Sequence, residues 1–395
     1  GRYDDVIREH MSGNRYDVVF LGGTSIYYPN IREAIKVIRE CSPKTKIVVG
    51  GGLISSQPEV MLELLKPDYG VIGEGEQTCL ELVKNLNNTE ACNKTPGLVV
   101  WKDGKPFVTA RRAGIRDLDL LPFPDLESFG LMEHLDNQTP WYMIYQAFDK
   151  PRAYPIISAR GCTAKCTFCF HTTGNHYAMR TIDNVIAEME YAVKKYNVNL
   201  FLFLDELFAF NKARVMEFCR KFKKLQKTIP YEVVVFFNLR CDIIDEEIID
   251  AIKELNPRNC VGFGVESYNI NVLKSMRKHI TPDQINNAFK ITSDRHITTQ
   301  CNVIFGDSAE TMDTAKDTLD FYTHNMDILR GGLNMTFISV FPGTELYHDC
   351  KTRGIIKDDV QFIEERANAK ADLIIRPLNM THMSDECFGR LVSMV

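Results

Sequence analysis

The sequence predicts an α/β protein in which a Rossmann-like parallel sheet precedes a partial (β/α)6 barrel of the TIM type. Between residues 16 and 86, short β-branched apolar runs alternate with helical patterns, which is typical of a parallel sheet covered on both faces. A second alternation begins at Tyr154 and contains six further strands. Six β/α units over about 190 residues fit a partial barrel better than the complete eight-unit barrel, which needs roughly 250 residues.

The first domain, residues 1–110, is predicted to contain three strands, each followed by a helix, and then a hairpin. Glycines stand where the strands end, and ligands dock at that edge of open α/β sheets. An Asp-Gly turn within residues 99–110 predicts the hairpin. The predicted strands are 16–22, 45–52 and 69–76, and the predicted helices are 30–41, 58–66 and one that runs through Leu86.

Residues 111–153 are irregular and interrupted by prolines, which indicates a linker with some short structure. The barrel is predicted over residues 154–345, and residues 346–395 form a C-terminal extension. The predicted barrel strands are 154–160, 199–206, 231–240, 260–267, 298–306 and 334–342. The predicted barrel helices are 183–196, 211–227, 245–255, 281–293 and 311–324.

Composition limits the classes of protein that the chain can represent. With 45% hydrophobic and 25% charged residues, the 395-residue chain has ample material for two or three cores. A net charge of −5 gives no general attraction to DNA, RNA or anionic lipid. We expect no membrane span, and twelve cysteines without a signal-peptide pattern indicate reduced thiols in the cytoplasm. Because the chain starts at Gly1 and stops within a helical pattern, we expect further residues at one or both ends.

Three cysteines, Cys162, Cys166 and Cys169, are crowded into eight positions directly after the first barrel strand and Gly161. Packing on one helix face is one interpretation, because cysteine behaves as a small hydrophobic residue. A zinc site is another, with His171 as a fourth ligand. Soft thiolates also suit iron–sulfur clusters, and three of them would leave one iron of a four-iron cluster open to substrate.

"CTAKCTFC" resembles the CxxxCxxC signature of radical S-adenosylmethionine (radical SAM) enzymes, and the resemblance extends over roughly residues 154–345. The resemblance implies a [4Fe-4S] cluster on the three cysteines and a partial barrel of six units. It also implies that the open iron binds S-adenosylmethionine (SAM). One electron, from a donor such as flavodoxin or ferredoxin, then cleaves SAM to methionine and a 5′-deoxyadenosyl radical.

The resemblance also implies a set of SAM-binding residues at the strand ends of the barrel. The aromatic residue before the last cysteine would stack near adenine, carboxylates would meet the amino group and the ribose, and a glycine would admit the adenine. Each residue has a plainer interpretation, because acidic residues often cap helices. These candidates are Phe168, Asp205, Glu206, Arg240, Glu266, Ser267 and Gly306.

The first domain resembles the cobalamin-binding domain that precedes many radical SAM barrels, on the run from "YDVVFLGGTS" to "GVIGEGE". Such domains often hold the lower cobalt ligand in a D-x-H-x-x-G loop, but here Arg8 replaces the aspartate before His10 and Gly13. Either the loop precedes Gly1, or cobalamin binds without a histidine ligand. The glycines predicted to lie near cobalamin are Gly22, Gly23, Gly50, Gly51 and Gly73.

The leading interpretation is a cobalamin-dependent radical SAM methyltransferase that acts on an unactivated carbon of a small molecule or peptide. Oxidative cyclisation or rearrangement with the same cofactors is the first alternative. Methylthiolation is weakened because the N-terminal half has no second cysteine triplet and the chain is not basic. A cluster or cobalamin sensor would leave the SAM-site residues unused. No catalytic residue is identified, and substrate contacts are sought among His171, His176, Tyr177 and Tyr268.

Overall fold

The computed structural model describes residues 3–139, 147–174, 176–329, 332–368 and 377–395. The chain forms two compact units, which are described one at a time. The first unit contains Gly1–Ile115, Thr167–Gly174 and Ser339–Arg376, and the second contains Arg116–Cys166, Asn175–Ile338 and Pro377–Val395. The domain boundaries predicted from the sequence stay a prediction, and residues 140–146 of the predicted linker lie outside the described residues.

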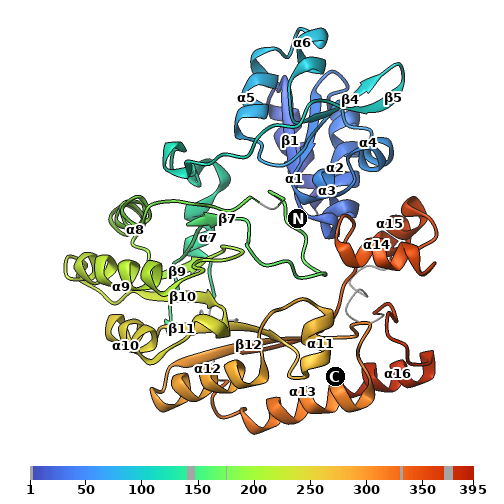
Figure 1. The fold of residues 1–395 in the computed structure, drawn as a ribbon. Coiled ribbons are helices and arrows are strands. Elements are labelled where there is room, and N and C mark those ends of the chain that lie inside the picture. Colours follow the sequence, from blue (N-terminus) through green and yellow to red (C-terminus); the bar gives the residue numbers. More distant parts are fainter. Residues whose placement is uncertain (1–2, 140–146, 175, 330–331, 369–376) are drawn as a thin grey trace. The chain divides into compact units, whose positions relative to one another are not determined.

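The first unit is built on a five-stranded sheet in the order β1-β2-β3-β4-β5 (Figure 1). β1, β2 and β3 are parallel, and Gly22 at the end of β1 lies opposite Gly50 at the end of β2. β4 and β5 form the predicted hairpin, with Asp103 and Gly104 both at positive φ, as a two-residue hairpin turn requires. The strands are β1 (Val18–Gly22), β2 (Lys46–Gly50), β3 (Tyr69–Val71), β4 (Leu98–Lys102) and β5 (Lys105–Val108).

The helices of the first unit include those predicted between the parallel strands. In α2, buried apolar residues recur every three or four positions, from Ile31 through Ala34 and Ile35 to Ile38, and form one core-facing stripe. The helices are α1 (Tyr3–Gly13), η1 (Ser25–Tyr27), α2 (Tyr28–Cys41), α3 (Gly52–Ser56), α4 (Pro58–Leu65), α5 (Glu76–Lys84), α6 (Thr89–Lys94), α14 (Glu345–Thr352) and α15 (Asp359–Asn368).

The second unit is built on a six-stranded, all-parallel sheet in the order β13-β12-β11-β10-β9-β6. This sheet confirms the predicted partial barrel. Its strands are β6 (Ala153–Ile156), β9 (Leu200–Phe203), β10 (Val234–Leu239), β11 (Cys260–Glu266), β12 (Thr298–Phe305) and β13 (Gly332–Phe337), and β7 (Ala159–Arg160) pairs with β8 (Ala178–Met179) in a separate ribbon.

Helices follow one another along one face of this sheet, as Figure 1 shows for α8, α9, α10, α12 and α13. The predicted helices are all present, and most begin with a side-chain cap, such as Asn211 before α9 or Asp245 before α10. The helices are η2 (Leu118–Leu120), η3 (Glu127–Phe129), α7 (Leu131–Asp136), α8 (Ile182–Tyr196), α9 (Lys212–Gln226), η5 (Cys241–Ile243), α10 (Glu246–Leu255), α11 (Ile270–Ser275), α12 (Pro282–Asp294), α13 (Met312–His324) and α16 (Asp385–Met394).

The two faces of β11 carry different kinds of residue, and this difference positions part of the site. Val261, Phe263 and Val265 belong to the large core between the sheet and its helices. The alternate residue Gly264 therefore faces the inner side of the curved sheet. The register with β12 shifts between Gly264 and Glu266, so the regular alternation ends there. None of the helices in the described segments combines the length and the apolar character that a membrane-spanning segment requires.

Candidate active site

The cysteine loop begins directly after the β7 segment. Gly161 has φ +77°, a conformation that glycine adopts without strain, and it turns the chain into the loop. Cys162 is half-buried, Cys166 is buried and Cys169 is exposed. All twelve cysteines of the chain are thiols rather than disulfides. Soft thiol donors of this kind fit an iron–sulfur cluster.

The thiols of the second unit lie among charged groups. Burial raises the pKa of Cys162, and the neighbouring Cys166 and Glu206 raise it further, whereas Arg240 opposes the increase. For Arg240, burial opposes the charged form, but Asp242 and then the two cysteines outweigh it, so its pKa is raised. Arg240 is also ion-paired with Asp242 at 2.8 Å. Thiolates formed on metal binding would thus have a permanent cation close by.

The three cysteines are divided between the two units. Cys162 and Cys166 belong to the second unit, whereas Cys169 belongs to the first. Among the described residues, no three His, Cys, Asp or Glu side chains are arranged to hold a metal ion. The cluster-ligand assignment therefore remains a prediction that rests on the motif.

Asp205 and Glu206 are adjacent in the sequence but have different surroundings. Asp205 is buried and accepts hydrogen bonds from the backbone N–H groups of Ser158 and Ala159 at 2.6 and 2.9 Å. Burial raises the pKa of Asp205 to about 6 despite these hydrogen bonds. Arg214 donates to the carbonyl oxygen of Ser158 at 3.1 Å and completes the network.

This network explains why the predicted strand 154–160 is interrupted between β6 and β7. The amides of Ser158 and Ala159 bond to the Asp205 carboxylate instead of continuing the ladder. Asp205 therefore shapes the backbone that leads into Gly161 and Cys162. Glu206 is exposed, and its negative charge contributes to the raised pKa of the Cys162 thiol. Neither residue caps α9, whose cap is Asn211.

Glu266 forms a buried ion pair with Lys278, a residue that the sequence did not single out. Lys278 Nζ lies 2.7 Å from Glu266 Oε1, and both side chains are almost fully buried. Burial opposes the charge on Lys278, but Glu266 and then Cys166 outweigh it and raise the pKa of the lysine. A Cβ atom on Gly264 would lie 2.5 Å from Glu266 Oε1 and 2.9 Å from Lys278 Nζ, so a side chain at this position would displace the paired atoms.

The backbone around this pair adopts uncommon conformations. Glu266 has φ +64°, and the two neighbours of Lys278, Arg277 and His279, have φ +52° and +53°. Such values are disfavoured for residues other than glycine and persist only where the surroundings impose them. These three residues, Glu266, Arg277 and His279, thus belong to one ion pair or are next to it in the chain. No periodicity or spacing in the sequence marks Lys278, because it lies in a loop between two helices.

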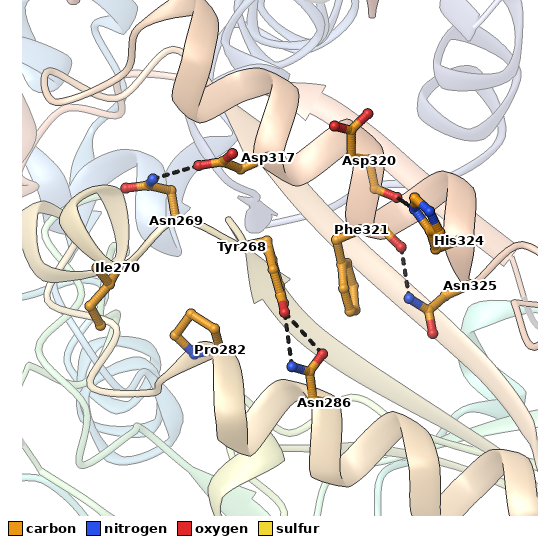
Figure 2. Close-up of a pocket in the computed structure, with 10 residues that line it drawn as sticks. All are labelled: Tyr268, Asn269, Ile270, Pro282, Asn286, Asp317, Asp320, Phe321, His324 and Asn325. Atoms are coloured by element: carbon orange, nitrogen blue, oxygen red, sulfur yellow. Dashed lines mark hydrogen bonds between the residues drawn. The ribbon is translucent and has the colours of Figure 1, made fainter.

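Ser267 and Tyr268 point toward the helices instead of sharing the surroundings of Glu266. The Ser267 and Thr318 hydroxyl groups are 3.2 Å apart, and Thr318 is on α13. Figure 2 shows the Tyr268 ring lying flat against Phe321, with the Tyr268 hydroxyl bonded to Asn286. Tyr268, Asn286 and Phe321 border a cavity of about 600 Å³ between α11, α12 and α13. The cavity is lined by Tyr268, Asn269, Ile270, Pro282, Asn286, Asp317, Asp320, Phe321, His324 and Asn325.

Gly306 follows β12 with φ +93°, and its N–H donates to Glu310 at 3.3 Å. Glu310 is buried, and burial raises its pKa to about 7. Thr314 donates a second hydrogen bond to Glu310 at 2.7 Å. The Gly306 turn is therefore braced by a buried carboxyl group.

The glycines of the first unit gather at the carboxyl ends of β1, β2 and β3. Gly51 has φ +79°, and a Cβ atom there would lie 2.7 Å from the Gly23 carbonyl oxygen, so this glycine is required by the protein's own backbone. Gly73 has φ +73° and open space around the position of a Cβ atom, and its N–H donates to Ser55 at 2.9 Å. An approaching ligand could thus contact Gly73. His10 lies within α1.

Comparison with known proteins places both domains. Residues 156–322 match the radical SAM superfamily, and residues 3–83 match the B12 binding domain. An uncharacterized methyltransferase of Pyrococcus horikoshii is 25% identical over 334 residues, which are 84% of this chain and 68% of that protein. The anaerobic magnesium-protoporphyrin IX monomethyl ester cyclase of Rubrivivax gelatinosus is 28% identical over 328 residues, 80% of this chain and 55% of the cyclase.

A solved structure shares the fold. The radical SAM methyltransferase TsrM of Kitasatospora setae, with cobalamin and a [4Fe-4S] cluster bound, superposes with a TM-score of 0.72 at 17% identity. The match covers 89% of this chain and 70% of TsrM. The predicted cofactors, a [4Fe-4S] cluster, SAM and cobalamin, are those of the two domains that this chain carries. The chain therefore carries a radical SAM domain, with a B12-binding domain in front of it.

Proposed function

We propose that the protein is a cobalamin-dependent methyltransferase that methylates an unactivated carbon of a small molecule or peptide. The observation that carries the proposal is the presence of a B12-binding domain and a radical SAM domain in one chain. Similarity to a curated methyltransferase over 84% of the chain supports it. The chain spans 68% and 55% of the two curated relatives described above, so the activity of the whole protein belongs to this proposal.

The charged residues of the second unit suit the parts of SAM, which has a carboxylate, an ammonium and a ribose. Lys278 is a buried cation that could meet the carboxylate, and Glu266 could accept hydrogen bonds from the ribose hydroxyl groups. Glu206 is an exposed carboxylate near Cys162 and could hold the ammonium group. Arg240 would offset negative charge on the thiolates.

Bound SAM and cobalamin would supply the radical and the methyl carrier. The overall reaction would consume one substrate C–H bond, two SAM molecules and two electrons. It would form the methylated product, 5′-deoxyadenosine, methionine and S-adenosylhomocysteine. One methyl group replaces one hydrogen atom, and the hydrogen ends in 5′-deoxyadenosine. We propose a flavodoxin or ferredoxin as the source of the electrons. With a net charge of −5, DNA is not a proposed partner.

The test is anaerobic incubation of reconstituted protein with reductant, cobalamin and SAM carrying a deuterated methyl group. Formation of 5′-deoxyadenosine, and of S-adenosylhomocysteine with a labelled product when substrate is present, is the expected result. Replacing Cys162, Cys166 and Cys169 by alanine should abolish all of them. Replacing the buried Cys219 and Cys260 is the matched control and should leave them intact.

Two outcomes would contradict the proposal at different levels. If the wild-type chain forms no 5′-deoxyadenosine, the SAM chemistry itself is absent. If it forms 5′-deoxyadenosine and converts substrate without S-adenosylhomocysteine or label transfer, the reaction is cyclisation or rearrangement. The similarity to the Rubrivivax cyclase makes that second function the alternative.

A further inference from the structure

Phe170, the residue after Cys169, lies in a slot formed by two glycines of the first unit. A Cβ atom on Gly52 would lie 3.4 Å from Phe170 Cε1, and one on Gly343 would lie 3.0 Å from Phe170 Cε2. Gly343 also has φ +82°, and its Cβ would lie 3.2 Å from the Cα atom of Ser56. A side chain on Gly343 would therefore crowd the ring, whereas a Cβ on Gly52 would touch it at van der Waals distance.

Three segments that are distant in the sequence meet around this ring. They are α3 with its end at Ser56, the cysteine loop from Thr167, and the segment before α14. The Leu346 N–H donates to the Thr167 carbonyl oxygen at 2.9 Å, which ties the loop to α14. The Gln57 side chain donates to the Tyr347 hydroxyl at 3.0 Å, which ties α14 to the end of α3.

The helix α3, next to Phe170, also borders the glycine-rich edge of the parallel strands. Ser55 of α3 accepts the hydrogen bond from the Gly73 N–H, and the Leu53 N–H donates to the Gly23 carbonyl at 2.9 Å. The short helix α3 thus bonds to the ends of β1 and β3, and its first residue contacts the ring of Phe170. Cys169, the residue before Phe170, is exposed.

We infer that Phe170 is a positioning residue that seats the Cys169 loop on α3 of the B12-binding unit and so sets the third cluster ligand. The inference rests on the proposed function only in taking Cys169 as a ligand. An aromatic residue with a purely structural role would lower stability when truncated but leave the behaviour of the cluster unchanged.

The experiment compares wild type, Phe170→Ala and Phe170→Leu, with Phe20→Ala of β1 as a control because Phe20 is 44% exposed. Hydrogen exchange of the Leu346 amide in the cluster-free chain reports whether the loop is seated. In Phe170→Ala we expect this exchange to be about tenfold faster or more, because its bond to Thr167 opens locally. Phe170→Leu, which refills most of the slot, should restore it, and Phe20→Ala should not change it.

The second readout is the cluster after anaerobic reconstitution. In Phe170→Ala we expect iron per chain to fall by about half or more, since a cluster held by fewer thiolates is labile. The electron paramagnetic resonance spectrum of the reduced cluster with SAM should also change, and Phe170→Leu should recover both. Gly343→Ala should act in the same direction, because its Cβ displaces the ring.

The outcomes separate this inference from the proposed function. Unchanged Leu346 exchange in Phe170→Ala would overturn the seating, whether or not the wild type binds iron. Faster exchange with unchanged iron and spectrum would show that the loop is seated but that the seat does not position Cys169, which also overturns the inference. Wild-type protein without any cluster would contradict the proposed function, while the exchange measurement would still decide whether Phe170 seats the loop.

Discussion

Lys278 Nζ lies 2.7 Å from Glu266 Oε1 in the interior of the second unit, and the two side chains are 12% and 9% exposed. The carboxylate comes from the end of β11, and the lysine comes from the loop between α11 and α12. An isolated buried charge is strongly disfavoured, whereas a paired one is tolerated. Each residue therefore keeps the other charged in the place where the proposed SAM site needs both signs.

The first prediction concerns the stability of this ion pair. Glu266→Gln and Lys278→Met should each lower the free energy of unfolding by about 3–5 kcal/mol, because each leaves an uncompensated buried charge. The double variant should lose clearly less than the sum of the two. Urea denaturation of the four proteins measures this. Strictly additive losses would show that the two side chains do not interact.

The second prediction concerns SAM affinity of the cluster-loaded protein. Both single variants should weaken SAM binding about tenfold to a hundredfold, the worth of a charge-assisted hydrogen bond of roughly 1.5–3 kcal/mol. Ser267→Ala is the matched control, because its hydroxyl group faces Thr318, and it should change affinity by less than about threefold. Anaerobic equilibrium binding is the measurement. A larger effect of Ser267→Ala than of Glu266→Gln would place the ribose contact at the serine.

The third prediction concerns cobalamin. Gly73→Leu should reduce the hydroxocobalamin that stays with the protein through gel filtration, because its side chain would fill the open space beside Gly73. Gly104→Leu is a matched control, since Gly104 has nearly the same φ, +74°, and equally open surroundings at the tip of the hairpin. Equal retention by the two variants would place cobalamin away from Gly73. Gly51→Ala should also lower stability, because of its contact with the Gly23 backbone.

The fourth prediction concerns Glu310, whose pKa is raised by burial from its ordinary value of 4.5 to about 7. Between these two pH values the unfolded chain has released a proton that the folded chain still holds, so stability falls as pH rises. Relative to Glu310→Gln, the wild type should lose about 1–3 kcal/mol between pH ~5 and ~8. Urea denaturation of both proteins at the two pH values measures the difference. Parallel pH profiles would show that Glu310 is ionised when folded.

Much of the fold could be predicted from local patterns. Alternating β-branched runs and helical stripes located the parallel strands and the helices that follow them, since burial on two faces demands continuous apolar strands. The Asp-Gly pair located the hairpin. The interruption at Ser158 could not be predicted, because it depends on the carboxylate of Asp205, which lies 47 residues later in the sequence.

Some residues of the candidate site could be proposed from the sequence, and others could not. The cysteine triplet, Glu266 and the glycines at the strand ends were found from the sequence, because their residue types and their places after predicted strands are visible there. Lys278 and Phe170 were not singled out. Their roles follow from Glu266, Gly52 and Gly343, which only the folded chain brings to them.

The sequence by itself determined the α/β class, the two successive sheets and the cysteine motif, since these depend on short-range spacing, and its resemblance to known families indicated the pair of cofactor domains. The tertiary structure decided which side chains face one another: Asp205 holds the Ser158 backbone, Ser267 turns to Thr318, and Lys278 pairs with Glu266. The physical reason is that strand and helix periodicity is set by neighbours in the chain. Charge pairing and steric fit are instead set by residues that meet only when the chain folds.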